Sequence, residues 1–201
     1  MIMSKDLDSL LSDLKTVHED LKPISAGTVV VADWVRLKCR YGCRGYGSHF
    51  CCPPFAPSPQ EMRKVLSEYR HAVLVRVQVP PSPDPSPDSA RSHVFGYKTQ
   101  LQRAVFELER KAFLSGYYKA FGMSSAPCHL CKICVAKEKL DKGEPVELND
   151  AMLCRHKDVM RPSLEACGID VFQTLRNAGY SPAVLKDFAE GVDIFGMVLL
   201  E

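Results

Sequence analysis

The sequence lacks any long apolar run, and neither sign of charge dominates it. No stretch of about 18 apolar residues occurs, so we expect no membrane-spanning helix. The 26 basic and 24 acidic residues leave a formal net charge of only +2, which gives no electrostatic reason to expect nucleic acid or a membrane surface as a partner. The first 20 residues are rich in acidic side chains and have no uninterrupted apolar core, unlike a secretory signal. We therefore expect a cytoplasmic protein.

Nucleotide-binding motifs are absent as well. The chain has neither a G-x-x-x-x-G-K-[ST] phosphate loop nor a G-x-G-x-x-G dinucleotide fingerprint, and Gly42-x2-Gly45-x-Gly47 fits neither pattern. A C-x3-C-x2-C run of the radical type is also missing, because three residues other than cysteine follow Cys43. No nucleotide cofactor is predicted.

Cysteine is what the sequence has in excess. Nine occur, and they fall into two groups with none between. An odd number argues against a closed disulfide framework, and clustered thiols in a reducing compartment indicate metal or redox chemistry. The first group comprises Cys39, Cys43, Cys51 and Cys52, and the second comprises Cys128, Cys131, Cys134, Cys154 and Cys167.

The order of apolar patterns predicts an α/β or α+β sandwich that forms one domain over residues 1–201. A small central sheet would have flanking helices and two cysteine-rich loops. The expected helices span 4–20, 58–69, 97–121, 161–178 and 183–189; the strands span 28–35, 71–79 and 193–200; the cysteine loops span 38–54 and 125–156; and a proline-rich loop spans 80–89.

The second cysteine group opens with the C-x2-C-x2-C run Cys128, Cys131 and Cys134. Three thiolates at this spacing can bind one face of a [4Fe-4S] cluster, with the fourth ligand from elsewhere in the chain. Cys154 is the expected fourth ligand. Cys167 is the reserve, because it falls in a predicted helix. The alternative is a zinc site in a structural or regulatory module, completed by a histidine. The histidines available are His129 and His156.

The first group lies in a glycine-rich stretch that ends in Cys51-Cys52-Pro53-Pro54. Adjacent side chains in extended backbone point in opposite directions, so we expect Cys52 to be a ligand beside Cys39 and Cys43, and Cys51 to be the spare. Three ligands on a four-iron cluster would leave one iron open. Three alternatives remain: ligands to the same metal as the second group, a zinc site that includes His49, or a metal-free reactive thiol loop.

Several longer motifs carry a resemblance. They are C-x3-C-x-G-Y-G with C-P-P over residues 39–54, E-R-K-A-F-x-x-G-Y-Y-K-A-F-G over 109–122, P-C-x-L-C-x-x-C over 127–134, C-R-H over 154–156 and R-P-S-L-E-A-C-G-I-D-V-F over 161–172. Together they resemble a prokaryotic family of predicted metal-binding proteins, a domain of unknown function, over roughly residues 28–180. The resemblance implies metal binding at Cys39, Cys43, Cys52, Cys128, Cys131, Cys134 and Cys154. Lys157 stands where the family's pattern usually has proline.

Three functions remain open. The first is an electron carrier whose [4Fe-4S] cluster passes single electrons to a redox partner protein. The second is an enzyme with two clusters, one with an open iron that binds a small-molecule substrate. The third is a zinc-stabilised module. Arg161 could tune a cluster by bonding a sulfide, or could instead bond a carboxylate. The sequence leaves open whether the protein is an enzyme.

Overall fold

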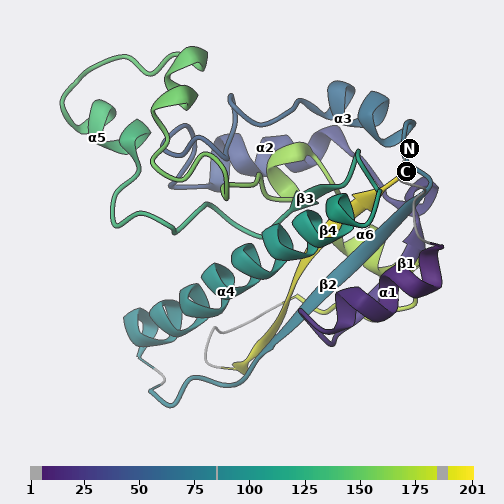
Figure 1. Cartoon of the computed structure of the whole chain (residues 1–201). Helices are drawn as coiled ribbons and strands as arrows, with labels where there is room; N and C mark the ends of the chain where they lie inside the picture. Colours follow the sequence, from purple (N-terminus) through teal and green to yellow (C-terminus); the bar gives the residue numbers. More distant parts are fainter. Residues whose placement is uncertain (1–5, 85, 185–189) are drawn as a thin grey trace.

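The computed structural model describes residues 6–84, 86–184 and 190–201. They form a four-stranded antiparallel sheet of order β1-β2-β4-β3, with helices on both faces (Figure 1). This is the α+β alternative of the predicted sandwich. The strands are β1 (Leu21–Ser25), β2 (His71–Val79), β3 (Phe121–Met123) and β4 (Val192–Leu200).

The two central strands pair over nine residues, from His71↔Leu200 to Val79↔Val192. Their sequences are nearly continuous apolar runs, as expected for strands covered on both faces. The predicted strand 71–79 is confirmed, and the predicted strand 193–200 is one residue longer at its start. Gly196 of β4 lies against α4, where an added Cβ would be 2.6 Å from the side chain of Val105.

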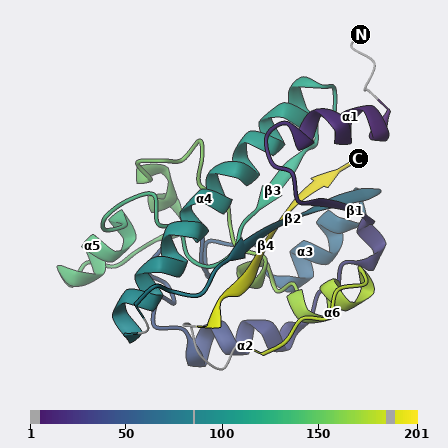
Figure 2. The same cartoon turned by 90° about the horizontal axis from the view of Figure 1, so that it is seen from below.

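Helices α1 (Leu7–Lys15) and α4 (Pro87–Leu114) cover one face of the sheet (Figure 2). Helix α4 directs Leu101, Val105, Leu108 and Ala112 into the first core at helical spacing. Helices α3 (Pro59–Leu66) and α6 (Val171–Asn177) lie on the opposite face, with α2 (Asp33–Gly42) beside them. Their core contains Met62, Leu164, Ile169 and Leu175.

The N-terminal region departs from the predicted elements. The helix predicted over 4–20 ends at Lys15, and its residues 4 and 5 lie outside the described residues. The segment Leu21–Ser25 is the edge strand β1, which tolerates Pro23 because one side of an edge strand needs no backbone donor. The predicted strand 28–35 is wrong: a 3₁₀ turn, η1 (Ala26–Thr28), precedes the start of α2 at Asp33.

Helix α4 begins earlier than predicted. Its first residue is Pro87, where the missing N–H costs no hydrogen bond, so the proline-rich loop 80–89 is shorter than expected. The helix also ends at Leu114 rather than 121, because the chain must turn through Gly116, at φ +100°, to enter β3. The predicted helix over 58–69 is confirmed in shortened form as α3, with its capping box between Ser58 and Glu61.

The predicted helix over 161–178 is two shorter elements. A 3₁₀ turn, η3 (Glu165–Cys167), ends at Gly168, which has φ +80°, and α6 begins after the capping residue Asp170. The capping aspartate and the left-handed glycine divide this segment. Of the predicted helix 183–189, residues 183 and 184 have no regular structure and residues 185–189 lie outside the described residues.

The two cysteine segments are more regular than loops. The first, 38–54, begins inside α2. The second, 125–156, contains α5 (Val135–Asp141) and a 3₁₀ helix, η2 (Leu148–Leu153), and it projects from the sandwich (Figure 1). None of the helices in the described residues is both long and apolar enough to cross a membrane. The assignment of all 201 residues to one domain stays a prediction.

Candidate metal centre

Three cysteines of the first group line one cavity. Cys39 lies in the last turns of α2, Cys43 caps the end of that helix, and Cys52 follows in the glycine-rich turn. Cys43 is exposed, Cys39 is half-buried and Cys52 is buried. These are the three residues that the sequence predicts as ligands. In the structure all three line the same cavity.

The position of α2 depends on Arg36. Its Nη1 donates hydrogen bonds to the carbonyl oxygens of Pro57, at 2.9 Å, and Ala166, at 2.7 Å. These bonds hold α2 against η3, where the Cys39 thiol lies 3.9 Å from the carbonyl oxygen of Glu165. Burial raises the pKa of Cys39, and neighbouring Cys43 raises it further. Arg36 thus fixes the helix that carries Cys39.

Cys51 faces away from this cavity and toward the second group. Its Sγ accepts a hydrogen bond from the backbone N–H of Cys128 at 3.0 Å, and it lies 3.9 Å from the Sγ of Cys52. Cys51 therefore contacts the second group, while Cys52 lines the cavity of the first. The expectation that the two side chains point in opposite directions along extended backbone is wrong, because this segment is a series of turns and the two sulfur atoms lie close together.

The second group gathers around α5 and η2. Cys134 is the N-cap of α5, and Cys154 directly follows η2. Arg155 joins the two segments, since its guanidinium donates to the carbonyl oxygen of Ile133 at 3.1 Å and to the carboxylate of Glu138 at 2.7 Å. This bridge holds Cys154 near the last two cysteines of the C-x2-C-x2-C run; that Cys154 is the fourth ligand stays a prediction.

The thiols of the second group are close enough to influence one another. Burial raises the pKa of Cys154, and Cys134, Cys131 and Cys51 raise it further. Burial also raises the pKa of Cys128 to about 11. Protonated thiols are poor metal ligands, so binding a cation here would displace protons from a set of soft sulfur donors. Such a donor set suits zinc or an iron–sulfur cluster.

A buried amide lies beside Cys128. Gln102, on α4, is 3% exposed, and its Nε2 makes no hydrogen bond of standard geometry within the part of the chain that the structure describes. Its side chain lies close enough to the Cys128 sulfur to act as a hydrogen-bond donor, which opposes the rise in the Cys128 pKa that burial causes. Buried donors are rarely left unpaired, so a thiolate at Cys128 would be the acceptor for this amide. The sequence gives no signal for Gln102 beyond its place in the helix.

Two histidines lie where the cysteine groups meet. The rings of His49 and His129 pack edge to face, with centroids 6.3 Å apart, and Nδ1 of His49 is 2.9 Å from the Ser48 hydroxyl. Burial lowers the pKa of both rings, which favours the neutral imidazole. Nε2 of His129 is buried without a partner among the described residues. His156 is exposed beside Cys154.

An ion pair with α4 anchors Arg161, the first residue of the R-P-S-L-E-A-C-G-I-D-V-F motif. Arg161 makes two bonds to the Glu109 carboxylate, at 2.5 and 2.6 Å, and both side chains are 14% exposed. Oε2 of Glu109 also accepts from the backbone N–H of Gly122 at 2.7 Å. Of the two roles considered for Arg161, the structure shows the bond to a carboxylate.

No three His, Cys, Asp or Glu side chains in residues 6–84, 86–184 and 190–201 are arranged to hold a metal ion. The model of the family described as "Predicted metal-binding protein (DUF2284)" matches residues 22–200, in agreement with the resemblance seen in the motifs. No curated protein and no solved structure matches the chain.

Proposed function

This chain belongs to the DUF2284 family of predicted metal-binding proteins, and we propose that it is an iron–sulfur protein with a [4Fe-4S] cluster on Cys128, Cys131, Cys134 and Cys154. The spacing of the first three and the approach of Cys154 support this ligand set. A bound cluster would supply one-electron redox chemistry. The chain's own part is to hold the thiolates, control access of water and set the potential.

The observation that carries this proposal is the buried amide of Gln102, which lies beside the Cys128 sulfur as a hydrogen-bond donor. Cluster sulfides and thiolates accept hydrogen bonds, and such bonds tune the reduction potential. A neutral amide donor stabilises the more negative, reduced state. Gln102 would therefore raise the potential of this centre.

Exposed apolar side chains directly precede two of the proposed ligands in the sequence and suit a protein partner. Met152 and Leu153 directly precede Cys154 and are 67% and 55% exposed, and Ile133 directly precedes Cys134 and is 48% exposed. Exposed apolar surface of this kind is typical of an interaction site. The partner that fits the chemistry is a redox protein that docks on α5 and η2.

Cys39, Cys43 and Cys52 form a second proposed centre. Three thiols beside a cavity could hold a cluster with one iron open to a small molecule, by analogy with the open position of catalytic zinc sites. In that case the Cys128 group would supply electrons to chemistry at the first group. Cys51 and Cys52, with their Sγ atoms 3.9 Å apart, would connect the two centres.

The experiment is a redox titration of Gln102→Leu followed by electron paramagnetic resonance. We expect a more negative potential than in the unmodified protein, because one donor to sulfur is lost. Gln100→Leu is the matched control, since Gln100 lies two residues away on the exposed side of α4. Equal reduction potentials in all three proteins would show that Gln102 does not bond to the cluster. If no protein gave a reducible signal, the proposal of a cluster would be wrong.

A further inference from the structure

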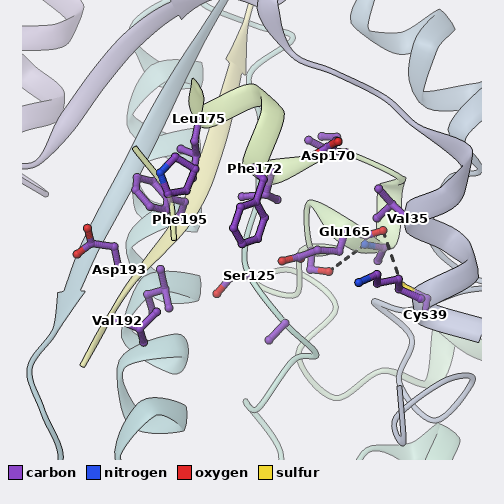
Figure 3. A pocket seen from close by; sticks show the side chains of 18 of the residues that line it. Val35, Cys39, Ser125, Glu165, Asp170, Phe172, Leu175, Val192, Asp193 and Phe195 are labelled. Atoms are coloured by element: carbon purple, nitrogen blue, oxygen red, sulfur yellow. Dashed lines mark hydrogen bonds between the residues drawn. The ribbon is translucent and has the colours of Figure 1, made fainter. Parts of the chain in front are cut away.

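The cavity that Cys39, Cys43 and Cys52 line extends well beyond the cysteines. It has a volume of about 790 Å³ and lies among α2, α6, η3 and β4, within the usual range for small-molecule sites. In Figure 3, Cys39 stands at one side and Phe195 and Val192 at the other, with Glu165 and Phe172 between them. A ligand here would lie across the face of the sheet with one end near the thiols.

The end of the cavity farther from the cysteines is mostly apolar, with Asp193 at its edge. Phe172 and Leu175 come from α6, and Ile194 and Phe195 come from β4. Phe195 is 7% exposed and packs on Tyr180, with ring centroids 5.2 Å apart. This end would accept an aliphatic or aromatic group and release water from it.

The end near the cysteines offers charges of both signs. Oε2 of Glu165 is buried and has no hydrogen-bond partner within the described parts of the chain, and the same holds for the Ser125 hydroxyl. Lys98 also lines the cavity, near enough to Glu165 for their charges to interact. Burial lowers the pKa of Lys98, while the charge of Glu165 opposes that change. A buried acceptor without a donor is unfavourable until a ligand supplies one.

Other charged residues around the cavity already have partners or lie at its mouth. Asp193 pairs with Arg76 at 2.7 Å, and Asp170 caps α6 by accepting from the backbone N–H of Gln173. Lys38 and Glu190 are exposed, and Lys38 lies 5.8 Å from the ring centroid of Trp34. Glu165 and Lys98 are thus the charged groups positioned to hold a ligand inside.

We propose that this cavity binds a zwitterionic amino acid with a long apolar side chain. The carboxylate would bond Lys98, the ammonium group would bond Oε2 of Glu165, and the apolar chain would extend between α6 and β4. Each charge on the ligand then meets an opposite charge in a partly buried setting, where such bonds are strong. The head group would lie beside Cys39 and Cys52. Binding of this ligand needs no metal. The test of this proposal is therefore independent of the test of the proposed iron–sulfur function.

A set of three matched probes tests this ligand class: 2-aminodecanoate, decanoate and nonylamine. They share an eight- to nine-carbon chain, and the last two lack the amino group and the carboxylate, respectively. Binding is followed anaerobically in metal-free and metal-loaded protein through the fluorescence of Trp34, the only tryptophan in the chain, which lines the cavity. We expect 2-aminodecanoate to bind at least tenfold more tightly than either partial probe.

Two substitutions assign the contacts. Glu165→Gln should weaken 2-aminodecanoate about tenfold and leave decanoate nearly unchanged. Lys98→Met should weaken both, whereas Lys38→Met at the mouth should weaken neither. Equal affinities for the three probes, no binding of any of them, or an unchanged 2-aminodecanoate affinity in Glu165→Gln would overturn the proposal. The probe comparison uses the unmodified protein, so the result stands even where a variant folds poorly.

Discussion

The backbone N–H of Cys128 donates a hydrogen bond to the Sγ of Cys51 at 3.0 Å. This contact joins residues 77 positions apart and brings the two cysteine groups together. Cys51 is 1% exposed, so its thiol has no access to bulk solvent and faces the second group from inside the protein. It therefore places a further sulfur atom beside Cys128.

We expect Cys51→Ala to lower the iron retained by the second group. The variant loses either a ligand or the acceptor that positions the Cys128 loop, and both losses weaken binding. Cys43→Ala is the control, because Cys43 is exposed at the end of α2. The resonance signal of the second group reports the effect; total iron does not, because Cys43→Ala would also remove iron from the proposed first centre. An unchanged signal in Cys51→Ala would mean that Cys51 only packs in the protein interior and has no part in metal binding.

Cys154→Ser should damage the cluster more than Cys167→Ser. Cys154 is half-buried beside Cys131 and Cys134, whereas Cys167 is fully buried in the second core with Leu164 and Ile169. Iron and sulfide per chain after anaerobic gel filtration measure the difference. If Cys167→Ser loses as much iron as Cys154→Ser or more, the two assignments are reversed.

The sequence predicted the fold correctly in segments where the local residue pattern favours the same element that burial in the folded protein requires. The run His71–Val79 is apolar enough to form a strand covered on both faces, and Ser58, Pro59 and Glu61 give a helix start that the structure confirms. It failed where tertiary context decides. Pro23 argues against a strand, yet β1 needs donors on only one side because it pairs with β2 alone.

The predicted strand 28–35 failed for a different reason. Its valines favour a strand by intrinsic propensity, but Val35 is buried from a helix that Arg36 anchors to the carbonyl oxygen of Ala166. That bond spans 130 residues, so no local pattern could reveal it.

For the candidate site, the sequence predicts ligands by spacing, and the structure adds their neighbours. The expected alternation of Cys51 and Cys52 side chains assumes extended backbone, whereas the structure has successive turns there, with a hydrogen bond from the backbone N–H of Cys52 to the carbonyl oxygen of His49. The approach of Cys51 to Cys128 and of Gln102 to the same centre depends on how α4 and the cysteine segments pack. Contacts between residues so far apart in the sequence cannot be predicted from the spacing of residues.

The ion pair between Glu109 and Arg161 should contribute strongly to stability. Both side chains are 14% exposed, and Glu109→Ala would leave the Arg161 charge buried without its partner. We expect a loss of about 3 kcal/mol in the free energy of unfolding. Glu107→Ala is the matched control on the same helix, since its pairing with Arg110 is exposed, and it should cost less than about 0.5 kcal/mol. Urea denaturation of metal-free protein measures both, and similar losses would argue against the buried pair.

Stability of the metal-free protein should fall as pH rises above about 8.5. Burial raises the pKa of Cys167 to about 12 in the folded chain, while an unfolded thiol titrates near 8.5. Above that pH the unfolded chain releases its proton and the folded chain keeps it, so the stabilisation present below pH 8.5 is progressively lost. Denaturation at pH 7.5 and 9.5 should show a smaller decrease for Cys167→Ala than for the unmodified protein. Equal decreases would mean that Cys167 does not contribute.

The most direct test of the central claim is anaerobic analysis of iron, zinc and acid-labile sulfide, with electron paramagnetic resonance of the reduced protein. An iron–sulfur protein predicts about four iron and four sulfide per chain for one cluster, or about twice that amount if Cys39, Cys43 and Cys52 hold their own. It also predicts a resonance signal that Cys154→Ser abolishes or alters. Stoichiometric zinc without sulfide, in protein produced with ample iron, would contradict the account and identify a zinc-binding module.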